Sequence, residues 1–211
     1  MNALLKTSLQ VMKALVLTAA LASFAGAETY TIDKNHSSMG FSVIHLMVST
    51  VRGGFGEFEG TIQFDPKNPE ATTAEATIQA ASINTMQPDR DKHLRTADFL
   101  DVEKYPTLTF KSKSIKQEGV TYLLTGDLTL HGVTKEIVIP LVINGPVKSP
   151  MGGKEVIGLS GQTKINRQDF GVSWNKQMDQ GGYVLGDDVT LEVNLEAGTT
   201  PPKEEGTTPK T

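Results

Sequence analysis

Hydrophobic and polar residues alternate with a period of two along most of this chain. The alternation is clearest over 188–196 and 120–130, and it recurs over 57–64 and 39–45. Such a period is typical of strands that bury one face and expose the other, as strands of antiparallel sheets do. Further strands are predicted at four apolar stretches, the third of them apolar on both faces: 72–83, 107–116, 134–147 and 155–166.

Short segments with turn-forming residues separate these strands, at 65–69, 118–119, 131–132, 144–146 and 151–153. The count is therefore roughly eight strands, and an up-and-down meander of that size can close into a barrel that leaves no strand edge exposed. We predict an all-β fold, an eight-stranded antiparallel barrel.

One segment, 88–100, departs from the strand pattern. Pro88 and several acidic residues stand at its start, and its charges are spaced as in a short helix. We expect Leu94, Phe99 and Leu100 to pack against the barrel, and extended structure to resume at Tyr105-Pro106. The prediction is a short helical excursion near 88–104.

The two ends of the chain differ from the middle. Two lysines precede an apolar run at 14–22, and the small residues Ala25-Gly26-Ala27 follow it. This order predicts a signal peptide over 1–27, cleaved near Ala27, and hence a periplasmic or secreted protein; a retained membrane anchor is the alternative. After cleavage no apolar run is long enough to span a membrane. The composition of 197–211 predicts a disordered tail, so the folded domain is expected over 28–196.

The composition excludes several classes of function. With 24 acidic and 20 basic residues the net charge is −4 at pH 7, and no basic cluster suggests a nucleic-acid partner. The chain has no cysteine, and therefore no disulfide or thiol nucleophile. The Gly-x-Ser-x-Gly motif of serine hydrolases is also absent. We expect no catalytic residue and no cofactor.

The four histidines, His36, His45, His93 and His131, show no short metal-binding spacing. His45 shares an apolar strand face with Phe41 and Val43, where a hydrogen-bonded buried histidine is a simpler explanation. We therefore expect no metal. A three-dimensional histidine cluster, serving as a metal site or supplying a general base, remains an alternative.

The interior of a barrel of about eight strands is either filled by side chains or holds one slender ligand. Small residues dilute the apolar faces here, which favours a hollow apolar lumen, although they could equally serve tight packing. Arg90 and His93 belong to a dense charged group that could cap the lumen mouth or form a surface network. The candidate ligand-binding residues are Phe41, Val43, His45, Phe58, Ile62, Arg90, His93, Leu94, Phe99, Leu128 and Leu130.

Several ordered motifs resemble those of the YceI-like family of exported proteins. They are Asp33-x-x-His36-Ser37, Gly40-Phe41-x-Val43-x-His45-Leu46, Asp89-Arg90-Asp91-x-His93-Leu94, Asp98-Phe99-Leu100 through Tyr105-Pro106, Leu128-Thr129-Leu130-His131-Gly132, and Asn166-Arg167-x-Asp169-Phe170-Gly171-Val172 with Trp174-Asn175. The resemblance implies a lipocalin-like barrel with an elongated hydrophobic pore. It also implies a ligand that is a polyisoprenoid, an isoprenoid quinone or another long-chain lipid, and it supplies no catalytic residues.

We therefore predict an exported binding protein that holds a long-chain lipid for carriage or storage. A metal-binding or hydrolytic enzyme that uses histidines, and an envelope stress protein without a ligand, are the alternatives. No exposed apolar stripe stands out, although edge or loop contacts could pair two barrels into a homodimer.

Overall fold

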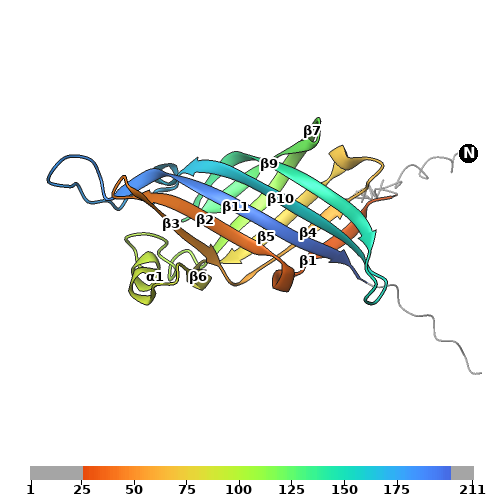
Figure 1. Ribbon diagram of the computed structural model, residues 1–211, viewed down its shortest axis with the longest axis horizontal. Helices are drawn as coiled ribbons and strands as arrows, with labels where there is room; N and C mark the ends of the chain where they lie inside the picture. The colour runs from red at the N-terminus through yellow and green to blue at the C-terminus, as the bar shows by residue number, and fades with distance from the viewer. Residues whose placement is uncertain (1–25, 201–211) are drawn as a thin grey trace, which may run out of the picture.

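The computed structural model describes residues 26–200, and these fold into one antiparallel sheet that curls into an elongated barrel (Figure 1). The predicted signal peptide falls outside this range except for its last two residues, as do residues 201–211. The strands are β1 (Glu28–Ile32), β2 (Ser38–His45), β3 (Ser49–Phe55), β4 (Phe58–Phe64), β5 (Thr73–Gln79), β6 (Ile83–Asn84), β7 (Thr107–Glu118), β8 (Thr121–Leu130), β9 (Val133–Lys148), β10 (Glu155–Asn166) and β11 (Leu185–Thr199).

The eleven strands occupy eight positions around the barrel, because three positions are interrupted. β1 and β2 follow one another along the long strand β11, which pairs with β2 over 185–194 and with β1 over 197–199. β3 and β4 likewise share one position, and β5 and β6 share the next. The pairings show this, because β6 pairs with β3 and β5 pairs with β4. Neighbouring positions are consecutive in the chain, and the predicted eight-stranded antiparallel barrel is confirmed.

Individual strands differ from the prediction in three places. The predicted strand at 72–83 is broken by a 3₁₀ helix at Ala80–Ser82, and neither β1 nor β3 was predicted. β3 contains Gly53-Gly54, which obscures its alternation; a Cβ on Gly53 would lie 2.6 Å from Cζ of Phe41, so the Phe41 ring occupies that space. Glycine is needed there because two neighbouring strands approach closely across an aromatic ring.

The last strand extends past the predicted end of the domain. β11 continues for three residues beyond Glu196, and Ala197 is fully buried between Ile32 of β1 and Ile157 of β10. The boundary was misplaced because Ala197, Gly198 and Thr199 carry little apolar surface, yet they close the barrel against β1.

The interior divides into two groups of buried residues. The first fills the half of the barrel where the described chain begins and ends, and its members are Tyr30, Ile62, Phe64, Ile115, Leu124, Leu141, Ile157, Leu159 and Ala197. The second lies in the other half and comprises Ala80, Ile83, Leu100, Leu108, Leu128, Leu130, Ile165 and Phe170. Only the first half is packed solid, since the second adjoins the cavity described below.

The predicted helical excursion is confirmed as α1 (Pro88–Leu94), followed by turns up to Pro106. Phe99 and Leu100 are buried and Leu94 packs against the second group, as expected. Pro88 opens the helix, and the Gln87 side chain caps it by accepting from the Arg90 N–H at 2.6 Å. Within residues 26–200 no helix has the length and apolar character that crossing a membrane requires.

Helix α1 is held against the edge of β6 that faces away from β3. The bonds come from side chains of α1 and from its C-cap residue, Arg95. Arg95 donates to the carbonyls of Ala81 and Ile83, at 2.7 and 2.6 Å. Arg90 donates to the Thr85 carbonyl and hydroxyl, both at 2.7 Å. Asp91, although buried, accepts from the Thr85 N–H at 2.8 Å and from its hydroxyl. These charged side chains satisfy backbone groups that a neighbouring strand would otherwise pair.

Replacing Asp91 with alanine should therefore destabilise the barrel. The Thr85 N–H would lose its acceptor at a buried site, which costs about 1–3 kcal/mol. Urea unfolding of Asp91→Ala against the parent protein measures this loss. Asp91→Asn, which keeps one acceptor oxygen, should lose less, and Lys92→Ala on the exposed face of α1 should stay within about 0.5 kcal/mol of the parent. Equal stability of Asp91→Ala and Lys92→Ala would contradict this role for the carboxylate.

Candidate functional site

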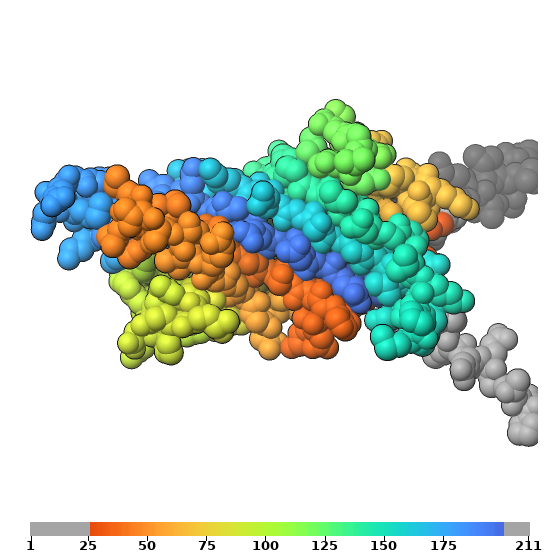
Figure 2. Space-filling model, viewed as in Figure 1, coloured from red at the N-terminus to blue at the C-terminus, as the bar shows by residue number. Residues whose placement is uncertain are grey.

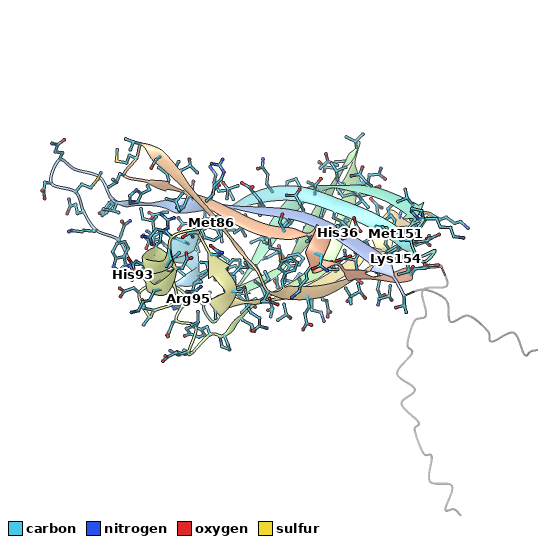
Figure 3. All side chains as sticks on the ribbon, turned by 60° about the horizontal axis from the view of Figure 1, so that its bottom comes forward. His36, Met86, His93, Arg95, Met151 and Lys154 are labelled. Carbon is cyan, nitrogen blue, oxygen red and sulfur yellow. The ribbon has the colours of Figure 1, made fainter. Side chains whose placement is uncertain are left out.

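A cavity of about 290 Å³ lies inside the barrel, in the half covered by α1. Its wall comes from strands β2, β3, β6, β7, β8, β10 and β11, and α1 with the following loop covers one side. Most lining side chains are aliphatic or aromatic, among them Phe41, Phe55, Leu108, Ile165 and Leu191. Arg90 is exposed and His93 half-exposed, so the cavity reaches the surface beside these two residues. Figure 3 shows His93 at the α1 end of the molecule.

Three rings form the part of the wall between α1 and the segment that precedes β11. His93 meets Phe99 edge to face at a centroid distance of 5.0 Å and meets Trp174 at 5.3 Å; Phe99 and Trp174 lie 5.1 Å apart. The His93 Nε2 atom lies 2.7 Å from a carboxylate oxygen of Asp98, which fixes the imidazole ring. Aromatic pairs at such separations attract one another beyond their simple burial.

Arg167 anchors the opposite side of the cavity. Its guanidinium is buried and donates to the carbonyls of Val172, Trp174 and Gly186, at 2.6, 2.9 and 2.9 Å. It also pairs with Asp187 at 3.0 Å. Burial lowers the pKa of Arg167, and the Asp187 carboxylate opposes that shift. A buried, charged arginine is tolerated here because each of its three guanidinium nitrogens donates to a protein oxygen.

Eight of the eleven candidate residues predicted from the sequence line this cavity: Phe41, Val43, His45, Arg90, His93, Leu94, Phe99 and Leu130. The other three, Phe58, Ile62 and Leu128, are buried in the packed interior and do not line it. Ile62 belongs to the solid half of the barrel, and Leu128 to the packed group beside the cavity. Alternation identifies the face of a strand on which a residue lies, but not its height along the barrel.

The residues that were missed come mainly from β3, β11 and the segment between β10 and β11. Val189 and Leu191 lie on the apolar face of the regular alternation over 188–196, so a signal existed for them. Arg167, Val172 and Trp174 stand in a motif that was recognised without any role being given to it. Val51 and Phe55 were missed with their strand.

The small residues do not hollow the barrel, so the argument for a lumen that rested on them was wrong. The residues that line the cavity include neither glycine nor alanine. Gly126 is covered by the Phe110 ring, whose Cζ would lie 2.5 Å from an added Cβ, and Ala80 is fully enclosed. These residues serve tight packing. The cavity lies instead where strand pairing with β7 has ended at Gln79–Thr107 and α1, not another strand, packs on the second edge of β6.

The four histidines do not converge within residues 26–200. His45 and His93 line the cavity, whereas His131 contacts the Tyr105 ring and the Phe170 carbonyl. The histidine-containing cluster with metal-ligand geometry in this range joins His36 to two acidic residues, Asp33 and Glu196.

The His36 cluster lies on the barrel surface, where its charges satisfy one another. His36 Nδ1 lies 3.1 Å from Asp33 and 3.9 Å from Glu196, and the Lys154 ammonium is 3.9 Å from Asp33. The hydrogen bond with Asp33 raises the pKa of His36, and the same bond lowers the pKa of Asp33. A cation would compete there with Lys154 for the Asp33 carboxylate.

Similarity to known proteins extends over nearly the whole described barrel. The family model of the YceI-like domain matches residues 30–197. A UPF0312 protein of Staphylococcus aureus strain N315 is 38% identical over 167 residues, which are 79% of this chain and 95% of that protein. The Campylobacter jejuni YCEI protein has a similar crystal structure, with a TM-score of 0.65 and 36% identity over 74% of this chain and 90% of the other.

Two more distant solved structures share the fold. Burkholderia cenocepacia BcnA matches with a TM-score of 0.69 and 23% identity, covering 78% of this chain and 98% of that one. A polyisoprenoid binding domain from Saccharophagus degradans matches with a TM-score of 0.60 and 15% identity, over 81% and 98% of the two chains. On the match of the family model and the identity to its relatives, the chain belongs to the YceI-like domain family.

Proposed function

We propose that this protein binds a long-chain lipid of the polyisoprenoid class, with part of the chain inside the cavity, and carries or stores it outside the cytoplasm. The observation that carries the proposal is an apolar cavity at which the side chains of Thr85, Arg90 and Arg167 are already bonded to the protein. Membership of the YceI-like family supports it, as does the shared fold of the Saccharophagus degradans polyisoprenoid binding domain. Export is supported by the signal-like sequence of residues 1–27.

The chemistry of the wall favours recognition of a hydrocarbon rather than a head group. The donors of Arg167 are directed at backbone carbonyls and Asp187, and the Thr85 hydroxyl is shared by Arg90 and Asp91. A ligand inside therefore gains chiefly from burial, at about 0.8 kcal/mol per CH₂ group. Its polar end would stay at the mouth, near Arg90 and His93.

The size of the cavity limits how much of the ligand it can enclose. A volume of about 290 Å³ lies at the lower end of the range typical of small-molecule sites, roughly 300–1,000 Å³. The first buried group closes the far half of the barrel, so a chain would enter and leave by the same mouth. A few isoprene units fit inside, and the remainder of a longer chain would lie at the rim.

Protein purified without detergent should therefore retain a lipid. Native mass spectrometry should show an added mass that organic extraction removes and that geranylgeraniol restores, because the cavity provides apolar contacts but few polar ones. Recovery of the extracted protein with no uptake of geranylgeraniol or any longer isoprenoid would count against the proposed function.

Filling the cavity should block this uptake. Leu191 lines the cavity, and Leu191→Trp would occupy space otherwise taken by several CH₂ groups, so affinity for geranylgeraniol should fall at least about tenfold. The matched control is Val138→Trp, because Val138 is 42% exposed on the outside of β9. Thermal melting checks that both variants fold. Equal affinities in the two variants would place the ligand outside this cavity.

A further inference from the structure

The turn between β2 and β3 presents three apolar side chains to solvent. Leu46, Met47 and Val48 are 41%, 66% and 84% exposed. Leu46 and Met47 also adopt left-handed backbone conformations, with φ of 51° and 62°. A turn that only had to reverse the chain would be more stable with glycine or asparagine at the positions of Leu46 and Met47. Contact with Gly182 accounts for only part of the Met47 side chain, which is still 66% exposed.

The same turn carries no formal charge. Residues 44–51 contain no Asp, Glu, Lys or Arg, in a chain of which 21% is charged. Its N–H groups are partly satisfied already, because Leu46 donates to the Val184 carbonyl at 2.8 Å and Val48 to the His45 carbonyl at 3.2 Å. The turn can therefore enter an apolar medium at a low cost in unpaired backbone groups.

Other exposed apolar side chains lie around the cavity mouth. Tyr183 is 57% exposed in the segment that contacts the turn, where Gly182 adjoins the Met47 sulfur. Met86 is 90% exposed and directly follows Thr85, a cavity-lining residue. Figure 2 shows the β2–β3 turn and the segment before β11 together at one end of the molecule, with the α1 region beside them. The described chain begins and ends at the opposite end, where β1 meets the end of β11.

We infer that the β2–β3 turn and Tyr183 form a docking surface for a lipid bilayer, which places the cavity mouth against the membrane. The inference rests on the proposed function, since a lipid that leaves a bilayer directly into the cavity never exposes its chain to water. The shape of the surface and the absence of charge from the β2–β3 turn argue for a bilayer. The apolar side chains stand on projecting turns rather than in a groove, and the turn has no charge to match a charged protein partner.

The test is flotation of the protein with vesicles of phosphatidylcholine alone and of phosphatidylethanolamine with phosphatidylglycerol. We expect the parent protein to float with both, and high salt to have little effect, because the contact is apolar. In Met47→Asp/Val48→Asp the bound fraction should fall about tenfold or more. The matched control is Val120→Asp/Met151→Asp, since Val120 and Met151 are 83% and 80% exposed on the β7–β8 and β9–β10 turns. Figure 3 shows Met151 at the end of the molecule opposite α1.

Uptake of geranylgeraniol in the absence of vesicles separates this inference from the proposed function. Uptake should be unchanged in Met47→Asp/Val48→Asp, because neither residue lines the cavity. Normal uptake with no flotation of the parent protein, or with equal flotation of both double variants, would overturn the docking surface and leave the proposed function intact. Flotation that depends on the turn, together with no uptake of geranylgeraniol, would overturn the proposed function and leave the docking surface intact.

Two further results would also overturn the inference. Flotation that requires phosphatidylglycerol and is lost in high salt would indicate electrostatic adsorption instead of apolar docking. A change in oligomeric state on substituting Met47 and Val48, measured by light scattering, would assign the turn to a contact between two copies of the chain.

Discussion

The outer edge of β6 is the feature on which the rest of the structure depends. In a closed barrel every strand needs a partner on both sides, and here strand pairing between β5 and β7 stops at Gln79 and Thr107. Beyond that point Arg95, Asp91 and Arg90 bond to the backbone groups that a strand would have paired. At this end a helix rather than a strand therefore forms part of the barrel wall. The cavity and its mouth both follow from this replacement of a strand by a helix.

The cavity is apolar for a related reason: the charged groups around it are used in holding its walls. Arg167 binds three backbone carbonyls and Asp187, which fixes the segment after β10, and Asp91 binds Thr85, which fixes α1. A buried charge without such partners would cost several kcal/mol in free energy, on the order of the stability of a small domain. Because these bonds are internal, the surface that the cavity presents is mostly hydrocarbon.

The sequence was sufficient for the fold because alternation, turns and the helical excursion are local signals. It placed Phe41 and Val43 on the inner face correctly, and it placed Phe58 and Ile62 there too, but only the first pair reaches the cavity. Height along the barrel depends on how the strands are staggered, and β1, β2, β3 and β4 share two positions in a way that no local pattern reveals.

Pairings between distant segments were also beyond sequence reasoning. The charge spacing of 88–100 predicted a helix, yet the role of Arg95 depends on carbonyls that are free only because β6 lacks a second partner. Ala197 was assigned to the tail because its side chain is small, although β1 and β10 enclose it completely. The small residues gave a wrong reason for the cavity on the same grounds. Whether the space beside a glycine stays empty depends on the neighbouring strand, and beside Gly126 the Phe110 ring occupies it.

The two sides of the cavity mouth are held independently of one another. Hydrogen bonds attach α1 to β6, and Arg167 attaches the segment around Val172 and Trp174 to β10 and β11. Within residues 26–200 no hydrogen bond joins α1 to that segment, and the α1 side meets it through the contacts of His93 and Phe99 with the Trp174 ring. Each such contact is worth about 0.5–1.5 kcal/mol. Aromatic packing therefore connects the two walls of the mouth, whereas hydrogen bonds anchor each wall to the barrel separately.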